Sequence, residues 1–261
     1  MVNELAVERR GTGEPIVLLH GLGHHRHVWK PVSRLLEDNF EVIAIDLPGF
    51  AESVNVPSPP RRVKKIAAFV EQRFAEWGVH RPHVVGNSLG GAVALELGAR
   101  GAARSVTALS PAGFLGPVNR FQTVGMLAAL RGSRVALPWS WQHALAQRSW
   151  GRRLHAAGIY ARSESLTPED ILTDMAHLKH CPSFEPVLAA NVLYSYSAPV
   201  RVPTTIAWGA QDRILPIGSL RRVAAKAPGA EIQVLHGCGH VPMQDDPKTV
   251  ADVVRRTAAS A

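Results

Sequence analysis

Short apolar runs alternate with amphipathic stretches along most of the chain. The runs are continuously apolar, as is typical of parallel strands covered on both faces. They lie at residues 15–20, 41–46, 83–86, 105–110, 204–209 and 231–236. A further strand near residues 5–8 is expected to pair antiparallel with the first run through the turn "RGTGEP".

The stretches between the runs carry the period of a helix. Val63, Ile66, Val70 and Phe74 fall on one face of a predicted helix at residues 61–79. Similar patterns predict helices at residues 28–38, 89–100, 217–227 and 246–257. Strands that alternate with helices predict an α/β fold, a mostly parallel sheet covered by helices on both faces.

The alternation stops between residues 112 and 200, where no clear strand pattern occurs. This stretch contains "LTPED", in which Thr167 suits a helix cap and Pro168 the first helical position. We therefore predict a helical cap at residues 112–200, inserted into a core formed by residues 1–111 and 201–261.

Composition agrees with a globular chain that has no membrane span. The 261 residues are 46% hydrophobic and 19% charged. No apolar run reaches the length of a membrane helix, and the first ten residues lack the apolar segment of a signal peptide. Cys181 and Cys238 show no metal-ligand spacing. We expect two free thiols, a cytoplasmic location and no stable insertion into a membrane.

The net charge of +8 raises the question of nucleic acid. The basic residues are mostly arginines spread along the chain, without a nucleic-acid-binding motif, so we expect no nucleic-acid partner. Residues 112–162 are unusual because they contain seven arginines and no Asp or Glu. These arginines either face solvent or pair with acids of the main domain, or they attract anionic esters or anionic lipid surfaces. The oligomeric state stays open.

The chain changes from strand to helix at "GNSLGG", with Ser88 at the corner. Such a turn exposes the corner side chain at the carboxyl edge of the sheet, and Gly86 and Gly90 let its two arms approach. The Leu89 N–H, at the start of the helix, and the Leu22 N–H, in the loop "HGLG", are the predicted donors of an oxyanion hole. Ser88 is the predicted nucleophile.

A serine nucleophile needs a base, and the base needs an acid. His240 follows the last strand and Asp212 follows the strand that ends near Trp208, so both lie at the edge that carries Ser88. His236 is the weaker alternative base. His20 is expected to shape its loop, and Asp245 and Asp246 are expected to cap the last helix.

At these residues the chain resembles the α/β-hydrolase superfamily. "LLHGLG", "AIDLPGFAES", "VVGNSLGG", "WGAQDRILP" and "GCGHVPMQDDP" match its ordered motifs over nearly the whole chain. The resemblance implies the α/β-hydrolase fold with a helical cap, and a hydrolase that forms a covalent acyl-enzyme and needs no cofactor.

The resemblance also narrows the chemistry. Haloalkane dehalogenases and epoxide hydrolases of this layout use an aspartate where this chain has Ser88. We expect a carboxylic ester hydrolase that acts on small esters with apolar acyl groups. A C–C bond hydrolase of meta-cleavage products, or a cofactor-free perhydrolase, stays open. A cap-gated small-molecule receptor is the alternative from another class.

Two further sets of residues are candidates for the site. Apolar side chains expected at the substrate pocket are Trp139, Trp141, Met126 and Val241. The cluster His24, His25 and His27 is expected to form a polar loop at the pocket mouth and to bind no metal, because no acid lies near it in the sequence.

Overall fold

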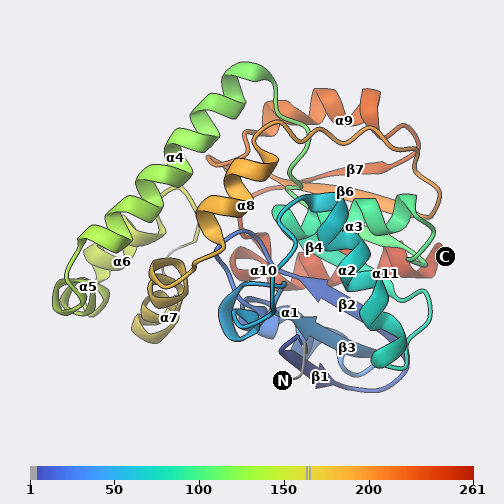
Figure 1. Ribbon diagram of the computed structural model, residues 1–261, viewed down its shortest axis with the longest axis horizontal. Helices are drawn as coiled ribbons and strands as arrows, with labels where there is room; N and C mark the ends of the chain where they lie inside the picture. The colour runs from blue at the N-terminus through green and yellow to red at the C-terminus, as the bar shows by residue number, and fades with distance from the viewer. Residues whose placement is uncertain (1–4, 163, 165) are drawn as a thin grey trace.

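A computed structural model describes residues 5–162, 164 and 166–261. Its centre is a seven-stranded sheet in the order β1-β3-β2-β4-β5-β6-β7, in which β2 to β7 run parallel (Figure 1). The strands are β1 (Val7–Arg10), β2 (Glu14–Leu19), β3 (Phe40–Ile45), β4 (His83–Asn87), β5 (Val106–Leu109), β6 (Thr204–Gly209) and β7 (Glu231–Leu235). The six apolar runs therefore form strands within one residue of the predicted ends, and the predicted fold class is confirmed.

The partner predicted for the first strand is wrong. β1 pairs antiparallel with β3, not with β2, and Val7 lies opposite Ile45. The reason is that β2 already has parallel neighbours on both sides, β3 and β4. The turn after β1 therefore carries the chain past β3 into the interior of the sheet.

Helices cover the two faces of the sheet. α2 (Val63–Glu76) and α3 (Leu89–Ala99) pack together on one face, and α1 (Lys30–Leu36) and α11 (Pro247–Ala259) pack together on the other (Figure 1). α9 (Leu220–Lys226) and the short α10 (Pro242–Asp245) follow β6 and β7. Short 3-10 turns at Arg26–Trp29 and Ile217–Ser219 begin the segments predicted as single helices at residues 28–38 and 217–227. A third 3-10 turn lies at Ala51–Ser53.

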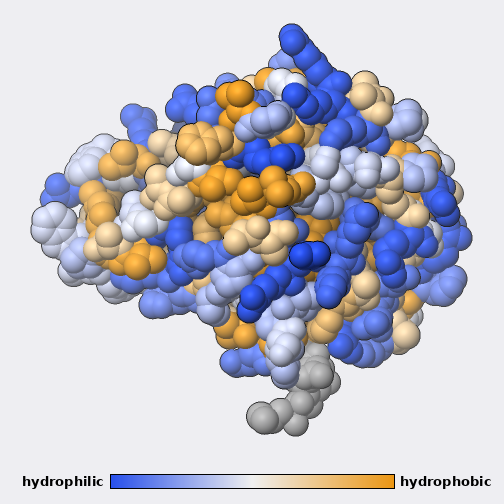
Figure 2. All heavy atoms as spheres, turned by 45° about the horizontal axis from the view of Figure 1, so that its top comes forward, coloured by the Kyte–Doolittle hydropathy of each residue, from blue (hydrophilic) through white to orange (hydrophobic). Residues whose placement is uncertain are grey.

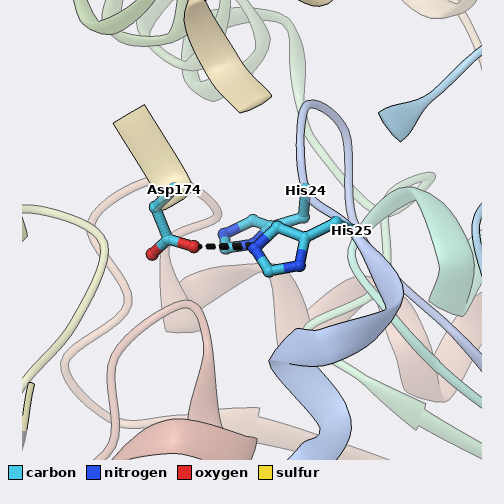
Figure 3. Close-up of side chains that lie close together, drawn as sticks. All are labelled: His24, His25 and Asp174. Atoms are coloured by element: carbon cyan, nitrogen blue, oxygen red, sulfur yellow. Dashed lines mark hydrogen bonds and ion pairs between the residues drawn. The ribbon is translucent and has the colours of Figure 1, made fainter. Parts of the chain in front are cut away.

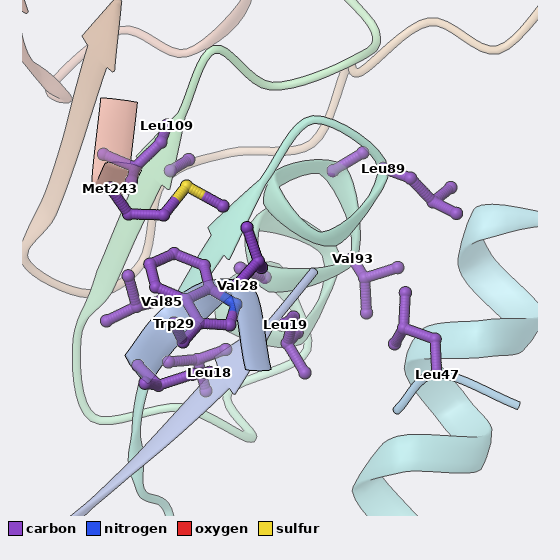
Figure 4. Close-up of a cluster of buried hydrophobic side chains, with 14 of the residues drawn as sticks. Leu18, Leu19, Val28, Trp29, Leu47, Val85, Leu89, Val93, Leu109 and Met243 are labelled. Carbon is purple, nitrogen blue, oxygen red and sulfur yellow. The ribbon is translucent and has the colours of Figure 1, made fainter. Parts of the chain in front are cut away.

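The core lies between the sheet and these helices. In Figure 4 the fully buried Trp29 packs among Leu18 and Val85 from two neighbouring strands and Met243 from α10. Leu89 and Val93 of α3 lie on the other side of the same strands. Val85 of β4 and Val93 of α3 both belong to this core, which therefore fixes the strand-to-helix turn that carries Ser88.

Helices fill the stretch between β5 and β6. They are α4 (Pro117–Ala136), α5 (Trp139–Ala146), α6 (Ser149–Ala156), α7 (Pro168–Lys179) and α8 (Phe184–Asn191). They lie beside the sheet, at the left of Figure 1. Thr167 begins α7 with a capping box, in which its side chain accepts from Asp170 N–H and the Asp170 side chain accepts from Thr167 N–H. The division into core and cap domains stays a prediction. No helix in the described part of the chain is long and apolar enough to cross a membrane.

Candidate active site

Ser88 lies on the turn between β4 and α3 with its backbone in the left-handed region, at φ 55° and ψ −112°. Few non-glycine residues adopt a positive φ, and such strain is typical of a nucleophile elbow. The two arms of the turn are close together. A Cβ on Gly86 would lie 2.1 Å from the carbonyl oxygen of Gly90, and one on Gly90 would lie 2.3 Å from that of Leu19. Glycine is therefore required at both positions.

His240 and Asp212 form a buried pair at the same edge of the sheet. The distance from His240 Nδ1 to Asp212 Oδ2 is 2.8 Å. Asp212 Oδ1 also accepts hydrogen bonds from the N–H groups of Ile214 and Leu215, which fix the carboxylate. If Nδ1 carries the proton that faces Asp212, Nε2 is left unprotonated and able to act as a base.

Groups that the sequence did not reveal hold His240 in place. Its backbone N–H donates to Ile159 O at 2.8 Å, and its carbonyl oxygen accepts from Asn87 Nδ2 at 2.8 Å. Asn87 precedes Ser88, so one residue connects the two loops. Asp245 does not cap the last helix as expected. It accepts from the backbone N–H groups of Gly239, Ala161 and Arg162, and Asp246 provides the cap instead.

The loop after β2 brings a second backbone donor to the site. His20 shapes this loop, because its Nε2 accepts from Leu47 N–H and its Nδ1 donates to Gly21 O. Burial lowers the pKa of His20 to about 4, so the ring is neutral. Among the described residues no hydrogen bond uses the N–H of Leu22 or of Leu89, and both residues line one cavity with Ser88. Two such N–H groups are able to stabilise an oxyanion.

Ser88 and His240 open into a cavity of about 130 Å³ between the strand ends and the helices after β5. Within the described part of the chain the Ser88 hydroxyl has no hydrogen-bond partner. Apolar side chains form most of the wall: Leu115, Val124, Leu127, Leu130, Leu178, Phe184, Val187 and Leu188. Figure 2 shows hydrophobic side chains gathered where α4 and α8 approach the core. The arrangement can hold an apolar group beside a hydroxyl, an imidazole and a carboxylate.

Comparison with known proteins shows the family of the chain. A model of the Alpha/beta hydrolase family matches residues 16–253.

The chain belongs to this family. Epoxide hydrolase EphH of Mycobacterium tuberculosis is 32% identical over 201 residues, which cover 72% of this chain and 91% of the relative. Monoacylglycerol lipase ABHD6 of Homo sapiens is 25% identical over 94% of this chain and 75% of the relative. The crystal structure of a membrane phospholipase A, described as a novel bacterial virulence factor, superposes with a TM-score of 0.78. It is 21% identical and matches 98% of this chain and 82% of that one, a likeness that shows the fold alone.

The pocket of this α/β hydrolase is not lined by the four residues expected from the sequence. Trp139 and Trp141 lie on α5 with 44% and 66% of their surface exposed. Met126 lines a neighbouring hollow, and Val241 is fully buried. The sequence marks a residue as apolar and large, but it does not show which way the helix turns that residue. Leucines and Phe184 take the expected place.

The histidine cluster has an acidic neighbour that the sequence did not reveal. Asp174 of α7 faces His24 and His25, the latter with Nε2 at 3.1 Å from Asp174 Oδ1 (Figure 3). Tyr160 donates to the other carboxylate oxygen of Asp174. Burial raises the pKa of Asp174, but His24 and the hydrogen bonds from His25 and Tyr160 lower it overall. His27 lies outside this group and faces Glu8. Although no acid is near the cluster in the sequence, the fold places Asp174 beside it. The absence of a metal stays a prediction.

Proposed function

We propose that the protein is a carboxylic ester hydrolase in which Ser88, His240 and Asp212 act as a catalytic triad. The observation that carries this proposal is the 2.8 Å pairing of His240 Nδ1 with the buried Asp212, beside a strained serine that opens into the same apolar cavity. The order Ser88, Asp212, His240 along the chain is also the order of this fold.

The proposed reaction gives each of these groups one role. His240 Nε2 takes the proton of the Ser88 hydroxyl while Oγ attacks the ester carbonyl. The oxyanion accepts hydrogen bonds from Leu22 N–H and Leu89 N–H, which developing charge strengthens. His240 then gives the proton to the departing alcohol, and water activated by the same imidazole releases the acid. Asp212 stabilises the imidazolium throughout. No cofactor takes part in this scheme.

The cavity and the relatives support an ester with an apolar acyl group. The leucine-rich wall favours an alkyl chain, and burying each CH₂ stabilises the bound ester by about 0.8 kcal/mol. One relative is named a monoacylglycerol lipase. The relative named an epoxide hydrolase makes an epoxide a necessary control substrate. We also propose a cytoplasmic location, which the buried, unpaired Cys181 and Cys238 support.

The test compares Ser88→Ala, His240→Ala and the double variant on p-nitrophenyl esters of increasing acyl length. Each single change is expected to lower kcat by about 10⁴-fold or more, and the double change to cost no more than either one, because the residues act as a unit. Ser140→Ala and His143→Ala, on the surface of α5, are the controls. Additive losses, or turnover of an epoxide but not of esters, would contradict the proposal.

A further inference from the structure

We propose that His24 and His155 form a polar subsite in the cavity, and that this subsite binds a hydroxyl group of the ester substrate. The inference rests on the proposed function. It adds a substrate class: esters that carry a free hydroxyl on the acyl or the alcohol portion, such as hydroxyacyl esters and partial esters of polyols.

The subsite stands out because the rest of the wall is apolar. His24 comes from the loop after β2 and His155 from α6, and both line the cavity that contains Ser88. His155 is also part of the wall of the neighbouring hollow. Among the described residues that line the cavity, these two rings are the imidazoles besides that of His240.

Both rings have nitrogens without hydrogen-bond partners, and His24 Nδ1 lies 3.9 Å from Asp174 Oδ1. The Nδ1 atoms of His24 and His155 are buried and accept or donate no hydrogen bond. Across the described residues, neither Nε2 has a hydrogen-bond partner either. Because the surrounding protein buries Nδ1 of each ring, Nε2 is the nitrogen that can bind a group in the cavity. Buried polar groups in folded proteins form hydrogen bonds to protein, water or ligand, so the two imidazoles are able to bind a polar group of a ligand.

The chemistry of the rings selects a neutral group that both donates and accepts. Burial lowers the pKa of His24 to about 4 and that of His155 to about 3, so both are uncharged near neutral pH. A neutral imidazole offers one donor and one acceptor, and a hydroxyl matches either. Asp174 also lines the cavity and disfavours an anionic ligand. Arg120, on the first turns of α4, is the cationic residue in the wall that would favour one, so the test includes an anion.

The neighbouring group of His24, His25 and Asp174 is less suited to a metal ion. His24, His25 and Asp174 place one ligand atom each within 4.8 Å of one another. However, Asp174 Oδ1 already accepts from His25 and Oδ2 from Tyr160. A metal would have to break the first of these bonds, whereas a hydroxyl at His24 or His155 breaks none.

The experiment measures affinity in Ser88→Ala, so that it does not depend on turnover. Two matched pairs are compared: an ω-hydroxyacyl ester with the unsubstituted acyl ester, and a monoacylglycerol with the propyl ester of the same acid. We expect about tenfold tighter binding of the hydroxylated member in at least one pair, as one net hydrogen bond provides. The pair that responds shows which portion of the ester carries the hydroxyl.

Variants then locate the effect. Adding His155→Phe or His24→Phe is expected to reduce the preference to about twofold or less and to leave the unsubstituted ester within about threefold. His143→Phe, the same change on the exposed face of α5, is expected to keep the preference. Thermal unfolding followed by circular dichroism identifies any variant that does not fold, and the second histidine then decides.

Four outcomes overturn the subsite. They are equal affinity within both pairs, a preference that survives both histidine changes, tighter binding of an ω-carboxyacyl ester, and a preference that appears only with added Zn²⁺. None of these touches the proposed catalysis, which is tested by the triad variants. Conversely, if the triad variants contradict the proposed catalysis, the affinity comparison still tests the subsite, because it does not depend on turnover.

Discussion

At the scale of a single residue, Asp212 divides its carboxylate between two tasks. Oδ1 accepts two backbone hydrogen bonds from the turn that follows it, at 2.9 and 2.8 Å, and Oδ2 faces the imidazole. The first oxygen fixes the side chain and the second fixes the histidine. The side chain is fully buried, so water does not compete for either oxygen.

Asp212→Asn is expected to preserve the fold and to lower kcat by about 10⁴-fold. The amide oxygen can still accept from the turn, but the amide nitrogen then faces His240 Nδ1 and favours the wrong tautomer. Steady-state kinetics measures the effect, and Asp252→Asn, on the exposed Asp252–Arg255 pair, is the control. An Asp212→Asn enzyme with nearly full activity would assign the orienting role to another carboxylate.

The sequence predicts some residues of the site better than others. Ser88 follows β4 directly, and Asp212 and His240 lie in the loops after β6 and β7. Because strand ends of a parallel sheet share one edge, the proximity of these residues is predictable. His155, Asp174 and Tyr160 are far from any strand end. Their meeting with the loop after β2 depends on how α6 and α7 pack, and local patterns do not encode that packing.

At the scale of an element, local sequence patterns predict the strands better than they predict the orientation of the helices. Interior strands are identified by apolar runs because both of their faces are covered. The partner of β1 was not predictable in this way, since a short turn suggests a hairpin even where the next strand already has two neighbours. Trp139 and Trp141 were misplaced for a related reason: aromatic side chains on a short helix suit a pocket and a surface equally well.

The segment that includes β7 and α10 contains Asp245, a buried carboxylate outside the proposed triad. Asp245 is 4% exposed and accepts three backbone N–H groups, two from residues 161 and 162 and one from Gly239, next to His240. We expect Asp245→Ala to lower the free energy of unfolding by about 2–3 kcal/mol, because it strands buried donors. It should also lower kcat, because the loop of His240 loses support.

Asp246→Ala is the matched comparison for this change. Asp246 caps α11 by accepting from Thr249 N–H, and losing such a cap costs about 1 kcal/mol. Urea unfolding and kcat are measured for both variants. Equal effects on kcat would contradict a special role for Asp245.

At the scale of the whole molecule, positive charge and exposed aromatic side chains occur together on the surface of α5 and α6. Trp141, Trp150 and Leu154, on α5 and α6, have 66%, 53% and 64% of their surface exposed. Arg148 and Arg153 lie on the same two helices or next to them, and neither forms an ion pair within the described part of the chain. Tryptophan with arginine is typical of surfaces that contact lipid headgroups.

We therefore expect the protein to sediment with vesicles containing phosphatidylglycerol and not with pure phosphatidylcholine, and to be released by salt. Arg148→Gln with Arg153→Gln should weaken this binding several-fold. Lys64→Gln with Lys65→Gln, an equal charge change on exposed α2, should not. If kcat/KM for anionic esters also falls with salt while that for neutral esters does not, the same arginines steer substrates. Equal binding to both kinds of vesicle would leave these arginines as solvated surface charge.

The contact between residues 159–162 and the loop of His240 also limits how such an enzyme can diversify. Ile159 accepts from the backbone of His240, and Asp245 holds Ala161 and Arg162. The helical segment is thus not an interchangeable module attached only where it leaves and rejoins the sheet. A chimera that imports residues 112–200 from a relative has a mismatched third junction, unless that relative's equivalents of Gly239 and Asp245 are transplanted with the segment. Gene recombination that respects only the two chain crossovers should yield folded but inactive hybrids, whereas crossovers chosen to include that third junction should recover turnover.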